Sequence, residues 1–197
     1  MSSLARPGGN MTGSADIQTV IAPKRLEALR QTVPRATRFG VLSSANAPSS
    51  RPCLDVAATT AEKLGIHLVT VGASTVADFD GAFAAMARDR VGGVLVHASS
   101  LTVRHDPRRL ADVALKHRLP TMFGAREHVV TGGLMSDAPD HLDLTRRSAV
   151  YIDKILKRGP TSRAAGRTGV QVPADHQRQD GQGVESADPG VAAGAGE

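Results

Sequence analysis

The sequence of 197 residues has one cysteine, no tryptophan, one tyrosine and four phenylalanines. The single cysteine, Cys53, cannot form an internal disulfide, and a cysteine-rich zinc site is excluded. The formal charge of +5 at pH 7 could suit a nucleic-acid partner, but such a surface needs aromatic side chains that stack on bases. We therefore interpret the basic residues as solvated helix faces and expect no nucleic-acid partner.

Long hydrophobic runs are absent as well. The longest, at 83–87 and 94–96, fall far short of the ~20 residues that a membrane-spanning helix needs. The first ten residues lack the basic start and the apolar stretch of a secretory signal peptide. We therefore expect no membrane span, and we expect the chain as written to remain cytoplasmic.

Several catalytic signatures are missing from the sequence. It contains no G-x-x-x-x-G-K-[ST] loop, no G-x-G-x-x-G after a strand and no G-x-S-x-G nucleophile elbow. The seven histidines show no i, i+3 or i+4 spacing that would bring metal ligands together on one helix. We therefore expect no catalytic residue, no metal ion and no cofactor, and the prediction is that the protein is not an enzyme.

From residue 38 to residue 151, short apolar runs rich in β-formers alternate with longer segments of helical period. This alternation is typical of repeated βα units on a parallel sheet. The expected strands are 39–42, 68–71, 94–96, 120–123 and 134–136. The expected helices are about 17–33, one ending at Gly65, one after Thr75, one opened by Asp106 and Pro107, and about 140–157. The sequence thus predicts an α/β fold with an open, mostly parallel sheet flanked by helices.

Apolar side chains at helical spacing predict which helix faces are buried. The inner face of the second helix is expected to contain Leu54, Ala57, Ala58, Ala61 and Leu64. The third helix, capped by Ser74 or Thr75, should direct one set of side chains inward, namely Phe79, Phe83 and Met86. One stripe of the last helix carries Leu142, Ala149, Ile152 and Leu156.

Ligands of open α/β sheets bind beyond the carboxyl ends of the strands, so the polar residues there are the candidate binding residues. A carboxylate of the ligand could receive two parallel hydrogen bonds from Arg126. Serines and asparagines at such positions could instead cap the next helix. The candidate ligand-binding residues are Ser43, Ser44, Asn46, Ser99, Ser100, Arg126, Glu127 and Asp137.

Six segments stand in the order in which a known family has similar ones: 4–13, 24–29, 83–88, 117–124, 132–136 and 151–159. Together they resemble the ABC transporter substrate-binding protein family, which has the type 1 periplasmic-binding fold. The resemblance implies a periplasmic receptor whose two lobes close on a small-molecule solute such as an amino acid. Its partner in a full-length relative is an ABC permease.

Relatives in this family begin with a signal peptide and a first lobe before they reach the segment similar to 4–13. The chain therefore resembles one lobe of a type 1 periplasmic-binding protein, the second lobe alone. Residues 1–14 would be a remnant of the crossover between lobes, and residues 15–158 the solute-binding lobe. Because a cleft needs two walls to bury a ligand, we expect weak binding or none by this lobe alone.

Residues 160–197 contain no Leu, Ile, Met, Phe or Tyr, a composition that cannot bury enough surface to fold. We expect a disordered tail over 159–197. Residues 169–183 can be encoded by codons that, read one base later, give Ser-Lys-Phe-Gln-Leu-Ile-Thr-Asn-Val and then Lys-Thr-Ala-Lys. Because this resembles the family's closing segment, we hypothesise a frameshifted C-terminus, which the encoding DNA sequence would test.

Two alternatives remain open at this point. One is a flavodoxin-like enzyme or regulatory domain with Glu127 or Asp137 as its active carboxylate. The polar cluster of Arg126, Glu127 and His128 could be an acid/base group, or else a helix-capping and ligand-orienting cluster without chemistry. The missing phosphate and nucleotide signatures argue against it. The other is a truncated gene product without function, which the missing first lobe and the altered ending favour.

Overall fold

The computed structural model describes residues 18–45, 47, 50–104 and 106–158. The described chain up to Ala138 forms one compact unit, and Pro139 begins a second unit that contains the last helix. The predicted crossover remnant and tail, at 1–14 and 159–197, lie outside the described residues, and so does Asn46.

The first unit is built on a five-stranded sheet in which all pairs are parallel. The strand order is β2-β1-β3-β4-β5. The strands are β1 (Arg38–Ser44), β2 (His67–Ala73), β3 (Val94–Val96), β4 (Thr121–Phe123) and β5 (Met135–Ser136). Each predicted strand is present, which confirms the open parallel α/β sheet.

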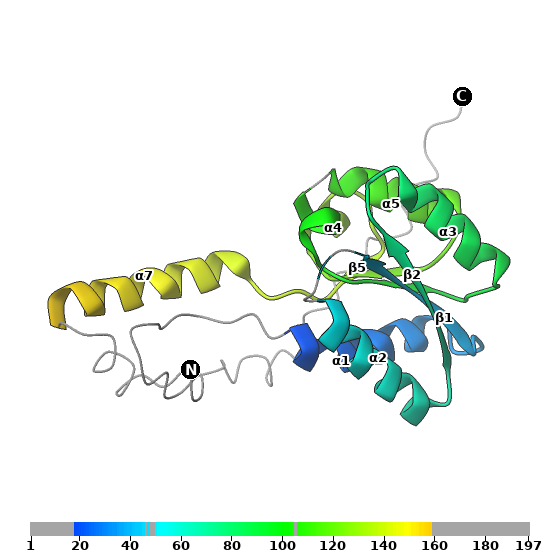
Figure 1. Cartoon of the computed structure of the whole chain (residues 1–197), viewed down its shortest axis with the longest axis horizontal. Helices are drawn as coiled ribbons and strands as arrows, with labels where there is room; N and C mark the ends of the chain where they lie inside the picture. Colours follow the sequence, from blue (N-terminus) through cyan, green and yellow to red (C-terminus); the bar gives the residue numbers. More distant parts are fainter. Residues whose placement is uncertain (1–17, 46, 48–49, 105, 159–197) are drawn as a thin grey trace. The chain divides into compact units, whose positions relative to one another are not determined.

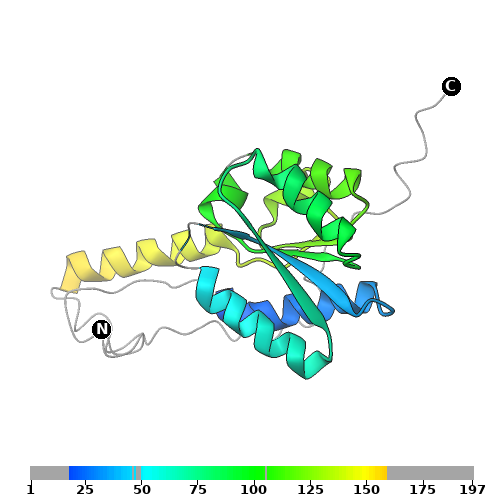
Figure 2. The ribbon, with the colours of Figure 1, turned by 45° about the vertical axis from the view of Figure 1, so that its right-hand side comes forward.

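Helices cover both faces of this sheet. Figures 1 and 2 show α1 (Gln18–Thr32) and α2 (Ser50–Leu64) on one face, with α3 (Asp78–Arg88) and α5 (Pro107–Lys116) on the other. Successive strand residues point to opposite faces of the sheet. Val41 therefore packs on the face covered by α1 and α2, and Leu42 packs on the face covered by α3 and α5. At Gly40 a Cβ atom would lie too close to the Met86 side chain, so a larger residue there would force that side chain of α3 to shift.

The helix predictions hold with two corrections. Ala58 is exposed, and Cys53 and Thr60 join the buried face of α2 beside Ala57 and Ala61, because the helix is rotated from the expected orientation. Neither Ser74 nor Thr75 caps α3 through its side chain.

Instead, the Asp78 carboxylate accepts hydrogen bonds from the backbone amides of Thr75 (2.8 Å) and Ser74 (2.9 Å). These two amides hold the pKa of Asp78 below its usual value. Two short helices, α4 (Ser100–Arg104) and α6 (Glu127–Val130), were not predicted from the sequence.

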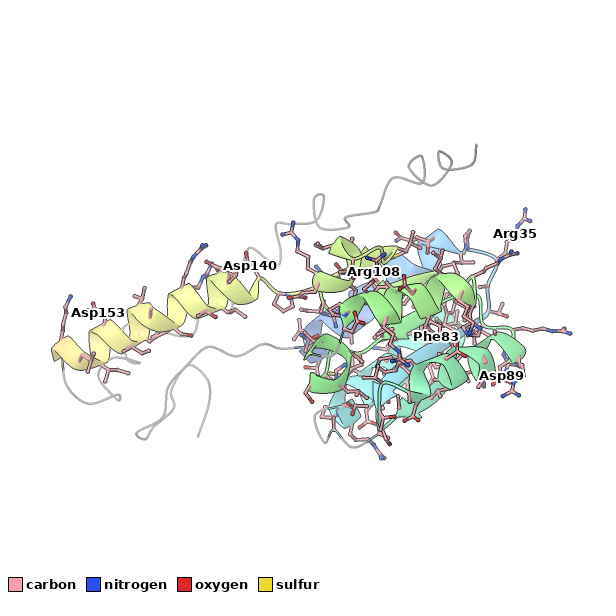
Figure 3. All side chains as sticks on the ribbon, turned by 90° about the horizontal axis from the view of Figure 1, so that it is seen from above. Arg35, Phe83, Asp89, Arg108, Asp140 and Asp153 are labelled. Atoms are coloured by element: carbon pink, nitrogen blue, oxygen red, sulfur yellow. The ribbon has the colours of Figure 1, made fainter. Side chains whose placement is uncertain are left out.

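The second unit contributes the helix α7 (His141–Arg158). The Asp140 carboxylate accepts a hydrogen bond from the Asp143 amide (2.9 Å) at its start, and Asp153 pairs with Lys157 (2.9 Å) near its end (Figure 3). Its apolar stripe faces solvent, with Leu156 80% exposed and Leu142 and Ile152 more than half exposed. In the described part of the chain, no helix is both long enough and apolar enough to cross a bilayer.

Candidate functional site

The carboxyl ends of the five parallel strands meet at one edge of the sheet, which we call the carboxyl edge. Ser43 and Ser44 are the last residues of β1 and are both buried. Ser99 and Ser100 follow β3, with Ser99 half-buried and Ser100 exposed at the start of α4. The fold therefore brings these four predicted residues to a common edge, while Asn46 lies outside the described residues.

The segment after β3 is organised by Thr102, whose side chain is 1% exposed. Its Oγ1 donates to the His97 carbonyl (2.9 Å) and accepts from the Ser99 amide (2.8 Å). The Ser99 hydroxyl lies 3.2 Å from the same Oγ1 atom. Thr102 thus fixes the turn that carries Ser99 and Ser100.

The segment after β4 is organised by His128, which is also 1% exposed. Its ring stacks on Phe123, with ring centroids 4.7 Å apart and planes 8° from parallel. Nε2 lies 2.8 Å from the Thr102 carbonyl oxygen, and Nδ1 lies 3.2 Å from the Ala125 carbonyl oxygen. Burial lowers the pKa of His128, and the two carbonyls and the Glu127 charge oppose this only in part.

Arg126 and Glu127, two of the predicted residues, are both exposed at the start of α6. Together with Val130 and Thr131 they line a shallow, open depression. Thr131 donates a hydrogen bond from its hydroxyl to the Glu127 carbonyl (3.0 Å), which stiffens this short helix. The two residues place a guanidinium and a carboxylate at the rim of one accessible depression.

Asp137, the predicted residue after β5, is half-buried, and its backbone is held at both ends. Its amide donates to the Phe123 carbonyl (3.2 Å), and its carbonyl accepts from Arg25 Nε (2.6 Å). Arg25 lies in α1, is 2% exposed, and also donates from Nη1 to the Gln18 side chain (2.7 Å). The first helix is thereby tied to the segment after the last strand.

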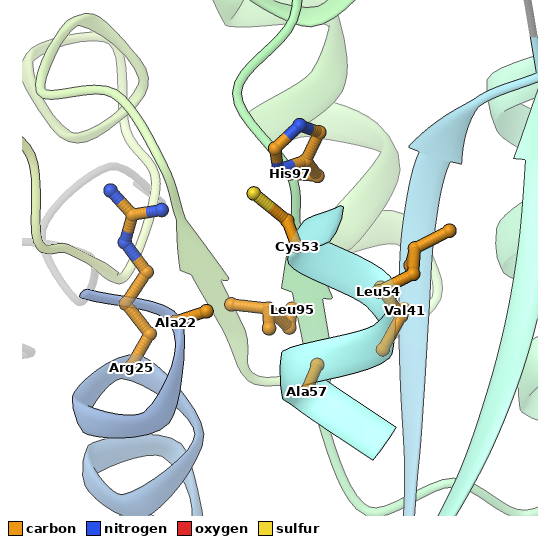
Figure 4. A pocket seen from close by; sticks show the side chains of 8 residues that line it. All are labelled: Ala22, Arg25, Val41, Cys53, Leu54, Ala57, Leu95 and His97. Carbon is orange, nitrogen blue, oxygen red and sulfur yellow. The ribbon is translucent and has the colours of Figure 1, made fainter. Parts of the chain in front are cut away.

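Arg25 also lines a small cavity with Cys53 and His97. Figure 4 shows Arg25 on one side of this cavity and the other two on the opposite side. The volume is about 10 Å³, close to what one water molecule needs and far too small for an amino acid. Cys53 lines it and is buried. Within the described ranges, no group of His, Cys, Asp and Glu residues could hold a metal ion.

The sequence analysis missed the roles of Arg25 and Thr102, and it considered His128 only as part of the polar cluster with Arg126 and Glu127. A signal for Arg25 existed, because it lies three residues after Ala22 and four before Leu29 on the buried stripe of α1. Thr102 and His128 carried none, since their contact joins residues 26 positions apart.

Comparison with known proteins gives the family of this chain. The model of the ABC transporter substrate binding protein family matches residues 1–164. The chain belongs to this family, which confirms the resemblance found in the sequence.

Individual relatives and solved structures are also similar to the chain. The chain is 24% identical over 155 residues to a tyrosine-binding protein of Clostridioides difficile (strain R20291), covering 79% of this chain and 44% of that protein. A crystal structure of a conserved domain protein from Vibrio cholerae superposes with a TM-score of 0.73 at 21% identity, covering 82% of this chain and 53% of the other.

The structure of an ABC domain in complex with L-Trp from Streptococcus pneumoniae gives a TM-score of 0.71 at 23% identity, covering 82% and 55%. The chain thus spans about half the length of the relatives it matches.

Proposed function

We propose that this chain is one lobe of a solute receptor for an ABC-type uptake transporter, with its ligand held at the carboxyl edge. The observation that supports the proposal is that Ser99, Arg126, Glu127 and Asp137 follow neighbouring strands at that edge in a chain of the substrate-binding family. The transporter's permease would be the partner, and the receptor would work outside the cytoplasmic membrane.

The ligand we propose is a free amino acid with an aromatic side chain. A free amino acid carries one carboxylate and one ammonium group, and the depression beside α6 offers a partner for each. Arg126 can form two parallel hydrogen bonds with the carboxylate, and Glu127, which lines the same depression, can accept from the ammonium group. Two relatives support the aromatic class, since one is named for tyrosine and the other was solved with L-Trp.

Burial of the ligand requires a second lobe that covers the depression. The depression lined by Arg126, Glu127, Val130 and Thr131 is open, whereas a binding site buries most of its ligand. Relatives about twice as long have room for a second lobe in the part that this chain does not span. We therefore expect full affinity only when such a lobe faces the carboxyl edge.

The test compares the chain with a chimera in which residues 1–164 replace the matching segment of the Clostridioides difficile tyrosine-binding protein. We expect L-tyrosine or L-tryptophan to stabilise the chimera by about 2.7 kcal/mol at a hundredfold excess over Kd, and the chain alone much less. L-lysine serves as the control ligand. A folded chimera that no amino acid stabilises would refute the proposal, and turnover of a substrate by the chain would favour the enzyme class instead.

A further inference from the structure

A continuous line of hydrogen bonds joins the two segments that carry the proposed binding residues. It starts at Ser99, whose amide donates to Thr102 Oγ1 (2.8 Å). The backbone carbonyl of the same Thr102 lies 2.8 Å from His128 Nε2. His128 is in turn the neighbour of Glu127 in α6. Thr102 and His128 are each 1% exposed, so the line runs beneath the surface rather than across it.

The His128 ring faces a carbonyl oxygen at each of its nitrogens. A neutral imidazole has only one N–H group, so it can donate to one of these carbonyls and not to both. The ring is neutral near pH 7 because burial disfavours its charged form. The shorter contact, 2.8 Å against 3.2 Å, favours Nε2 as the protonated nitrogen.

We propose that His128 is a positioning residue of the ligand site, which sets the spacing between Ser99 and Glu127 through its Nε2–H bond to the Thr102 carbonyl. This inference rests on the proposed function, because it concerns the same site. The bond to Ala125 could not do this, since it stays within one turn of chain, whereas the bond to Thr102 crosses between the segments after β3 and β4.

The geometry explains why histidine suits this position. Phe123 fixes the plane of the ring by stacking, so Nε2 has little freedom to turn away from Thr102. A displacement of Thr102 would be passed to Ser99, because Thr102 Oγ1 holds the Ser99 amide and lies 3.2 Å from its hydroxyl.

We call the bond from His128 Nε2–H to the Thr102 carbonyl the tether. Three substitutions distinguish the effect of the tether from that of simple core packing. His128→Gln keeps a donor at about the reach of Nε2, His128→Asn carries its donor only about as far as Nδ1, and His128→Phe keeps the stacking without any donor. Amide hydrogen exchange in the full chain reports on residues 99–104 without any ligand. We expect exchange there to rise about tenfold in the Asn and Phe variants and to stay near the wild-type rate in the Gln variant.

The same variants in the chimera connect the tether to binding. We expect affinity for L-tyrosine or L-tryptophan to fall about tenfold with Asn and Phe and to be restored with Gln. Equal affinity in all four proteins would overturn the inference, as would a Gln variant that behaves like the Asn variant. Failure of the proposed function differs from both results, because the unsubstituted chimera would then bind no amino acid.

A spectroscopic measurement needs no variant and therefore does not depend on whether a variant folds. The ¹⁵N shifts of the His128 ring in the full chain should show Nε2 protonated and Nδ1 bare at pH 7.5. If the ring is protonated at Nδ1 instead, Nε2 has no proton to donate to the Thr102 carbonyl, and the inference is wrong.

Discussion

Replacing Thr102 by valine is the sharpest test of the polar network at the carboxyl edge. Valine has nearly the shape of threonine, so Thr102→Val removes the hydroxyl and leaves the packing in place. The His97 carbonyl then loses its donor and the Ser99 amide loses its acceptor. Each unsatisfied buried group costs about 1–3 kcal/mol, and because Ser99 is half-buried, water can partly replace the bond to its amide. We therefore expect the free energy of unfolding to fall by about 2–3 kcal/mol.

The matched control is Thr102→Ser, which keeps the hydroxyl and removes only a methyl group from a side chain that is 1% exposed. Losing that group costs about 1 kcal/mol in transfer free energy. Urea unfolding of the three proteins gives the comparison, provided that the slopes against urea agree. If Thr102→Val destabilises the protein less than Thr102→Ser does, then the hydroxyl does not hold the segment together and the reasoning fails.

Three further predictions concern other parts of the molecule. In the chimera, Arg126→Ala should weaken binding of an aromatic amino acid by about 2 kcal/mol, and Arg126→Lys should restore only part of it, because the charge returns without the two-pronged geometry; an unchanged Kd in calorimetry would remove Arg126 from the site. His128 has a pKa below its ordinary 6.5, so below pH 6.5 the unfolded chain binds a proton that the folded chain excludes. The free energy of unfolding should therefore fall as the pH drops from 6.5 towards the folded-state pKa, and this component should vanish in His128→Gln; parallel stability curves for the two proteins would contradict it. Gly40→Ala should destabilise the protein, because the new methyl group meets Met86, whereas Gly81→Ala in α3 meets nothing within 4 Å and should stabilise it by about 0.5–1 kcal/mol; thermal unfolding compares the two.

The regular elements could be predicted from the sequence because each repeats an apolar pattern long enough to detect. Phe79, Phe83 and Met86 mark one face of α3, and all three are fully buried as expected. The short helices α4 and α6 could not be found in this way, because neither spans two full turns and so neither has a period to detect.

The positions of the candidate residues at the strand ends could be predicted from the sequence, but the contacts among their neighbours could not. The position of Arg126 after β4 follows from the strand pattern, and it does lie at an accessible strand end. The bond between Thr102 and His128 depends on how two segments approach one another in space, which no local pattern records. The stripe of α7 illustrates the same limit: its helical spacing was visible in the sequence, but the spacing does not say that Leu156 faces solvent.

The buried position of the single cysteine makes the chain convenient for site-directed labelling. Cys53 lies against a cavity of about 10 Å³, which no fluorophore or spin label can enter. A cysteine introduced at the exposed Ser100 would therefore react first with a maleimide, without prior removal of the native thiol. In the chimera, a second label on the other lobe would give a distance that should shorten on ligand binding if the proposed closure occurs.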